Sequence, residues 1–244
     1  MYIQVSNLSK SFSGQEILKD ISFTISDNQK VGLVGKNGCG KSTLFRILLG
    51  QEETDGGNVV INPTVAQIGY LPQVVDTIDL LSSGEKTQQA LTQILKDKPA
   101  MLILDEPTNH LDWKALDWLE NIVKTFSGPI LLVSHDRKFL DNTVNRIFKL
   151  EDGKMEVYGG NYSFYRRQKQ IKEEANARMY EEQQDRIKKL TERVRVMKTK
   201  TQQLESKTTG TDLYVRKKAA KSARAAINIE RKIAKELAET KIER

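Results

Sequence analysis

The chain has 244 residues, a net charge of +7 and a mean hydropathy of −0.52, which is polar for a globular protein. No apolar run approaches the roughly 20 residues of a membrane-spanning helix, and the N-terminus lacks the basic-then-apolar layout of a signal peptide. The single cysteine, Cys39, excludes an internal disulfide framework, so we expect a cytoplasmic protein without a membrane span.

The N-terminal part is predicted to consist of strands. Residues 2–5 and 21–25 alternate apolar and polar side chains, as half-buried strands do. Ser13-Gly14-Gln15 indicates a turn between them, directly after Phe12. The apolar run at 31–34 predicts a buried strand.

A phosphate-binding loop follows that strand. Its residues match the pattern GxxxxGK[ST] and are Gly35, Lys36, Asn37, Gly38, Cys39, Gly40, Lys41, Ser42 and Thr43. A helical pattern begins at Thr43, which completes the strand–loop–helix context that the motif requires. The glycines let backbone N–H groups turn toward phosphate oxygens, Lys41 is placed to reach the β- and γ-phosphates, and Ser42 to bind Mg²⁺. A Gly-rich turn before an ordinary helix would rarely show the full motif.

Further elements alternate between strands and helices. Strands are expected at 58–62, 66–71, 101–104, 129–133, 146–150 and 154–158, and helices at about 81–96 and 113–126. Ser82 or Ser83 is a plausible cap of the first of these helices. The alternation predicts an α/β fold with a parallel core sheet, in which ligands bind beyond the carboxyl ends of the strands. Gly35, Asp105, Glu106 and His135 all follow strands directly, so we expect them to converge on one ligand.

Four side chains are candidates for catalysis or metal binding. Asp105, at a strand end, is placed to hold Mg²⁺ through water, and Glu106 beside it to polarise an attacking water. His135 could donate a hydrogen bond to the γ-phosphate, although a single histidine is more often structural. Gln73 ends a strand and could contact Mg²⁺ or the water.

The C-terminal part has a different composition. Residues 1–160 carry a net charge of −4, whereas residues 161–244 carry 23 Lys and Arg against 12 Asp and Glu, giving +11. A coiled-coil seam repeats at spacings of three and four: Ile187, Leu190, Val194, Met197, Thr201 and Leu204. After a polar break at 206–212, a second helix carries Ala219, Ala223, Ala226, Ile233 and Leu237 on one side. We therefore predict a domain at 1–160 and a long antiparallel helical hairpin at 161–244, whose charge fits nucleic acid, an anionic surface or simply a solvated Lys-rich helix.

The ordered motifs in residues 1–160 resemble those of the ATP-binding cassette (ABC) superfamily. In this resemblance Phe12 matches the position that stacks on adenine, Gly35 to Thr43 the Walker A motif, and Gln73 the Q-loop. The signature is matched by Leu81, Ser82, Ser83, Gly84 and Glu85, the Walker B motif by Met101 to Glu106, the D-loop by Leu111-Asp112 and the switch histidine by His135. The resemblance implies an ATPase with the cofactors ATP and Mg²⁺, the metal being held by Ser42, Gln73 and Asp105. It also implies that the signature caps the γ-phosphate of another cassette.

A narrower set of motifs looks like the ABC-F class. These are the stretches from Leu104 to Asp112, Ser134 to Leu140, and Tyr158 to Tyr162. The resemblance implies a twin-cassette protein that acts on the ribosome, with a charged hairpin that reaches the 23S rRNA and the tRNA at the E site. A second cassette or a homodimer is the implied protein partner.

Three features depart from the usual pattern. Gln73 and Leu81 are eight positions apart, which leaves only a reduced helical subdomain and resembles the ribosome-protection branch that confers antibiotic resistance. Ser83 replaces the usual signature glycine, and the chain looks like the N-terminal half of a twin-cassette protein. The alternatives are the ATP-binding subunit of a membrane transporter, which normally keeps the helical subdomain, and a chromosome or DNA-repair ATPase, whose coil interrupts the cassette.

Overall fold

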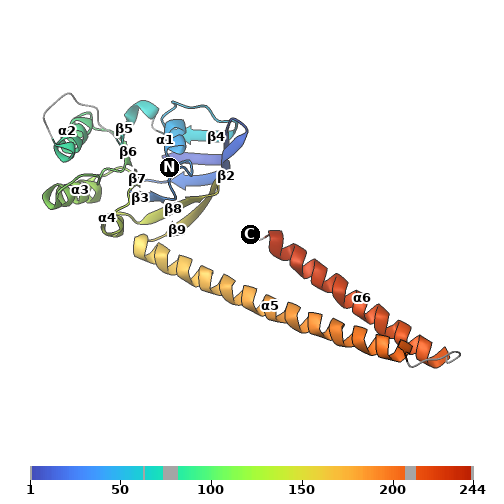
Figure 1. The fold of residues 1–244 in the computed structure, drawn as a ribbon. Helices are drawn as coiled ribbons and strands as arrows, with labels where there is room; N and C mark the ends of the chain where they lie inside the picture. Colours follow the sequence, from blue (N-terminus) through green and yellow to red (C-terminus); the bar gives the residue numbers. More distant parts are fainter. Residues whose placement is uncertain (1, 63, 74–81, 207–212, 243–244) are drawn as a thin grey trace. The chain divides into compact units, whose positions relative to one another are not determined.

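The computed structural model describes residues 2–62, 64–73, 82–206 and 213–242 (Figure 1). The chain divides into two compact units, Met1–Lys169 and Gln170–Arg244. The first unit ends later than residue 160 because the first turns of the next helix pack on it: Tyr165 is buried among the core side chains of the sheet.

Three N-terminal strands form an antiparallel sheet in the order β2-β1-β4: β1 (Ile3–Phe12), β2 (Gln15–Ile25) and β4 (Gly56–Ile61). Ser13 and Gly14, with φ of 50° and 82°, form a two-residue turn between β1 and β2. Both strands are longer than predicted, because shifts in register after Val5, Leu8 and Lys10 interrupt the simple alternation on which the prediction rested.

The central sheet has six strands in the order β5-β6-β7-β3-β8-β9. The first five are parallel and β9 is antiparallel, which confirms the predicted parallel core. The strands are β3 (Lys30–Val34), β5 (Ile68–Leu71), β6 (Met101–Asp105), β7 (Ile130–Val133), β8 (Arg146–Glu151) and β9 (Lys154–Gly159). A short 3-10 helix, η1 (Val65–Gln67), precedes β5.

Alternation along the central strands creates two cores. In β6, Met101 and Ile103 pack toward the antiparallel sheet and helix α1 (Lys41–Leu48), whereas Leu102 and Leu104 face the opposite layer. That layer contains α2 (Ser83–Lys96), α3 (Trp113–Thr125) and α4 (Arg137–Thr143). Each fully buried aliphatic side chain contributes roughly 1.5–3 kcal/mol, so both faces of the sheet fix its position. Of the described residues between β5 and β6, only those of α2 are helical, in agreement with a reduced helical subdomain.

Two aspartates fix the loops that follow β6 and β7. Asp112 is the N-cap of α3 and accepts a hydrogen bond of 2.8 Å from the N–H of Ala115. Asp136 caps α4 in the same way, accepting from the N–H of Phe139 at 3.0 Å. Each cap stabilises its helix by about 1 kcal/mol and orients the residues immediately before it.

The second unit is formed by most of α5 (Tyr162–Ser206) together with α6 (Leu213–Ile242) (Figure 1). Lys198 forms an ion pair of 2.6 Å with Glu230, and the hydroxyls of Thr201 and Ser222 are 3.0 Å apart. Because the residue numbers rise on α5 while they fall on α6, the hairpin is antiparallel, as predicted.

The predicted seam forms the inner side of the hairpin. Val194 and Thr201 are buried, and Ile187, Leu190 and Met197 are half-buried. Ala219 and Ala226 are buried on α6, whereas Leu237 is exposed. The side chain of Leu204 and the break at 207–212 lie outside the part that the structure describes. Among the described helices, none has a stretch long and apolar enough to cross a membrane.

Candidate active site

The phosphate loop connects β3 to α1. Gly38 and Gly40 have φ of 77° and 106°, which side chains disfavour, and Gly40 is the N-cap of α1. The ammonium group of Lys41 donates hydrogen bonds of 2.9 Å to the carbonyls of Gly35 and Lys36. The loop therefore curls around the ammonium group of the lysine.

Two loop residues face the interior instead. A Cβ on Gly35 would lie 2.3 Å from the carbonyl oxygen of Leu150, so only glycine fits at the end of β3. Cys39 is half-buried and packs against the core, with its sulfur near Gly35. Neither Cys39 nor Gly35 lines the cavity described below.

The two carboxylates at the end of β6 are buried. Asp105 ends the strand, and burial raises the pKa of its carboxyl group while the nearby Lys41 lowers it. Glu106 leaves the strand with φ of 52°, and its N–H donates to the carbonyl of Val133 at 2.9 Å. A side chain in this left-handed conformation is uncommon and is typical of functional positions.

Glu106 is paired with His135 from the end of β7. The backbone N–H of His135 donates to Oε2 of Glu106 at 3.1 Å. Nε2 of the same histidine lies 3.2 Å from Oε1, which is buried and has no hydrogen bond. Burial raises the pKa of Glu106, and the histidine opposes this rise. The histidine side chain is 66% exposed, so it can turn toward a ligand while its backbone holds the glutamate.

The ends of β3, β6 and β7 surround a cavity of about 500 Å³, here called the nucleotide cavity. Its walls include most of the residues that the sequence predicted for the site: Phe12, Asn37, Gly38, Gly40, Lys41, Ser42, Thr43, Gln73, Asp105, Glu106 and His135. Lys36 and Gly35 line a neighbouring cavity instead.

Phe12 and Gln73 reach the nucleotide cavity from its periphery. Phe12 stands at the end of β1, 42% exposed, with the ammonium of Lys10 at 5.1 Å from its ring centre. Gln73 follows β5 and is exposed. An exposed ring and an amide at the rim are available for contact with a ligand.

The residues of the predicted signature lie elsewhere. Ser82 and Glu85 form a capping box at the start of α2, in which the Glu85 carboxylate accepts from the Ser82 N–H at 2.9 Å. Gly84 is buried against the carbonyl of His110, which a Cβ would approach to 2.8 Å. Ser83 is the first residue of α2, and Leu81 lies outside the described residues. This stretch does not line the nucleotide cavity.

Two further residues support the site although the sequence did not indicate their roles. Ile17 on β2 lines the nucleotide cavity and would meet a Cβ on Gly40 at 2.8 Å. Ser134 joins two loops, because its hydroxyl is 2.8 Å from that of Thr108 and accepts from the N–H of Asp136 at 3.0 Å. Ile17 had no signal in the sequence, since it lies far from the motif along the chain.

Comparison with known proteins agrees with this geometry. Two family profiles, both described as ABC transporter, match residues 18–77 and 148–242. Solved structures with the same fold include an ATP-binding subunit of an ABC transporter, with a TM-score of 0.61 and 20% identity over 65% of this chain and 90% of that one. Another is a dimeric ATP-binding cassette in a post-hydrolysis state bound to ADP and Pi. Its TM-score is 0.56, and it is 18% identical over 64% of this chain and 98% of its own. The chain thus has the P-loop ATPase fold of ABC cassettes.

Relatives among characterised sequences point to one class of these cassettes. ABC transporter F family member 2 of Arabidopsis thaliana is 29% identical over 76% of this chain and 40% of its own length. ATP-binding protein Uup of Buchnera aphidicola is 35% identical over 66% of this chain and 34% of its own length. The energy-dependent translational throttle protein EttA of Escherichia coli is 33% identical over 67% of this chain and 37% of its own length. The cassette therefore has ABC-F relatives, and it spans between 34% and 40% of the length of these three proteins.

Proposed function

We propose that this chain binds and hydrolyses ATP as one cassette of an ABC-F protein that acts on the ribosome. The observation that carries the proposal is the convergence of the phosphate loop, Asp105, Glu106 and His135 on one cavity. The similarity to a relative whose name assigns it to translation supports the ribosomal part.

The residues have separate roles in this proposal. Lys41 and the loop N–H groups bind the phosphates, and Phe12 stacks on the adenine. Glu106, buried and with a raised pKa, is the general base that takes a proton from the attacking water once it is ionised. His135 holds the base and donates to the γ-phosphate, and Gln73 positions the water.

Mg²⁺ fits the oxygen donors of the cavity. Ser42, Asp105 and Gln73 all line it, while the described residues contain no cluster of three acidic, histidine or cysteine ligands that would hold a metal by protein alone. Mg²⁺ typically takes one or two protein oxygens together with substrate phosphates, which is the arrangement these residues allow. When bound, the ion neutralises charge on the phosphate oxygens.

We also propose that the chain works with a second cassette, or with a second copy of itself. The stretch from Ser82 to Glu85 lies away from the chain's own nucleotide cavity, so it is free to cap the nucleotide of a partner. The short link before α2 suggests the ribosome-protection branch, because little chain remains there to engage a membrane protein. The basic hairpin would then contact rRNA and tRNA phosphates.

Two measurements test the proposal. ATP turnover is measured with the wild type and with Glu106→Gln, which should bind ATP and not turn it over. Co-sedimentation with ribosomes is then compared with recovery in a membrane fraction. Binding to membranes together with a transporter subunit, and not to ribosomes, would support the transporter alternative and contradict the ribosomal one.

A further inference from the structure

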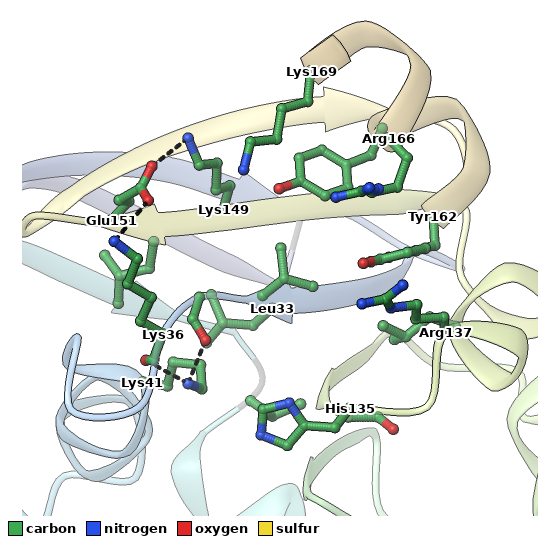
Figure 2. A pocket seen from close by; sticks show the side chains of 17 residues that line it. Leu33, Lys36, Lys41, His135, Arg137, Lys149, Glu151, Tyr162, Arg166 and Lys169 are labelled. Carbon is green, nitrogen blue, oxygen red and sulfur yellow. Dashed lines mark hydrogen bonds and ion pairs between the residues drawn. The ribbon is translucent and has the colours of Figure 1, made fainter. Parts of the chain in front are cut away.

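The first unit contains a second cavity beside the nucleotide cavity, with a volume of about 330 Å³, here called the side cavity (Figure 2). The two cavities share Lys41, Val133 and His135 in their walls. In Figure 2, Lys41 and His135 lie at one end of the side cavity, and side chains of α5 lie at the other. The two cavities therefore adjoin each other at Lys41 and His135.

The side cavity is strongly cationic. One carboxylate, Glu151, lines it together with six cations: Lys36, Lys41, Arg137, Lys149, Arg166 and Lys169. Lys149 is already neutralised, since its ammonium lies 2.6 Å from Glu151 and 3.3 Å from Glu156. Lys36 lies 3.7 Å from Glu151, on the solvent side.

Two cations of the side cavity form no hydrogen bond or ion pair with any residue that the structure describes. Arg137 begins α4 and Arg166 lies in the second turn of α5; both are exposed, and neither guanidinium contacts an acceptor among the described residues. Figure 2 shows them along one wall, with Tyr162 between them. A guanidinium offers a planar set of donors that matches phosphate oxygens.

A buried tyrosine gives the same wall a neutral donor. Tyr165 lines the side cavity, is only 5% exposed, and has edge-to-face ring contacts with Tyr158 at 4.9 Å and with Tyr162 at 5.7 Å. Burial raises the pKa of its hydroxyl, so the group stays protonated at neutral pH. These contacts fix the first turns of α5, which carry Arg166, at the wall of the side cavity.

We propose that the side cavity binds the inorganic phosphate released by ATP hydrolysis, as a second phosphate site beside the nucleotide. This inference rests on the proposed ATPase function. The shared wall at Lys41 and His135 places the side cavity directly beside the phosphate loop that would hold the nucleotide. The volume is at the lower end for ligand sites, and the cations point into a hollow rather than along a surface, which favours a small anion over a polymer.

The test compares two double variants of the full chain. Arg137→Gln/Arg166→Gln removes the unpaired guanidiniums. Lys138→Gln/Arg167→Gln is the matched control, because it removes the same charge from exposed neighbours that do not line the side cavity. ADP affinity is measured first by calorimetry, and inorganic phosphate is then titrated into ADP-saturated protein.

We expect phosphate affinity to fall about tenfold or more in Arg137→Gln/Arg166→Gln, with ADP affinity unchanged and the control equal to the wild type. Product inhibition of turnover by phosphate should weaken in parallel. If the wild type binds no ADP, the proposed function fails and this inference with it. If ADP binds but phosphate affinity is the same in both double variants, only this inference is overturned. It is also overturned if the first variant loses affinity for RNA while its phosphate affinity stays normal.

Discussion

The clearest prediction concerns Glu106→Gln, which should abolish the proposed ATP hydrolysis and stabilise the fold at the same time. Removing a general base costs about 10²–10⁴-fold in rate, equivalent to about 3–5 kcal/mol of barrier. The amide keeps one oxygen to accept the His135 N–H, which now lies 3.1 Å from the carboxylate, so the loop geometry should persist. ATP binding should therefore stay near the wild-type level.

The gain in stability follows from the burial of the charge. Oε1 of Glu106 is buried without a hydrogen bond, a situation that costs about 1–3 kcal/mol. Nε2 of His135 at 3.2 Å offsets only part of this cost, because the pKa of Glu106 remains raised. Because burial raises the pKa above the ordinary value of 4.5, the folded state holds its proton longer than the unfolded state. The cost therefore appears as the pH rises from 4.5 through the raised pKa, and it is absent at lower pH. Glu106→Gln should melt higher than the wild type at neutral pH, with a difference that shrinks as the solution is acidified.

Glu120→Gln is a matched control, because removing this carboxylate should lower the stability at neutral pH instead of raising it. Burial alone would raise the pKa of Glu120, but hydrogen bonds from Lys124 at 2.9 Å and Asn142 at 3.0 Å outweigh it and lower the pKa. Its charge therefore stabilises the fold above pH 4.5, and this contribution is lost as the pH falls through the lowered pKa. Thermal melts of the wild type and both variants between pH 4 and 8 measure the two stability differences. Single-turnover ATP assays measure the loss of hydrolysis in Glu106→Gln. A difference for Glu106→Gln that does not change with pH, or turnover near the wild-type rate, would refute the reasoning.

Three other predictions follow from the same geometry. Lys41→Ala should weaken ATP binding itself, because the ammonium lies inside the phosphate loop, and calorimetry showing unchanged affinity would remove it from that role. The isolated chain should hydrolyse ATP slowly, with a rate that rises with protein concentration or on adding a second cassette, since its signature stretch does not reach its own cavity; a fast rate from a verified monomer would contradict this. RNA binding by the full chain should weaken steeply between 50 and 200 mM salt, because the +11 charge of residues 161–244 releases counterions from phosphates, whereas binding that ignores salt would argue against an electrostatic contact.

The sequence predicted most of the fold and most of the nucleotide cavity. Local patterns were sufficient for this: the glycines and lysine of the phosphate loop, the apolar strands that end at Asp105 and His135, and the three-and-four spacing around Val194. In a parallel sheet the carboxyl ends of the strands share one edge, so residues that follow strands are close in space whatever their separation in the chain.

The tertiary structure decided what local patterns do not contain. Ile17 lies over Gly40 because the antiparallel sheet packs on the loop, and the inward-facing sulfur of Cys39, together with the carbonyl of Leu150, leaves room only for glycine at position 35. Glu106 meets His135 only because β7 lies beside β6 in the sheet, which places Nε2 of the histidine 3.2 Å from Oε1 of the glutamate. The convergence of Arg137 and Arg166 depends on how α5 begins against the sheet, through the burial of Tyr165. These contacts depend on residues that are distant in the sequence or on which face of an element another element covers. The periodicity of a single segment contains no information on distant contacts or on the element that covers a face.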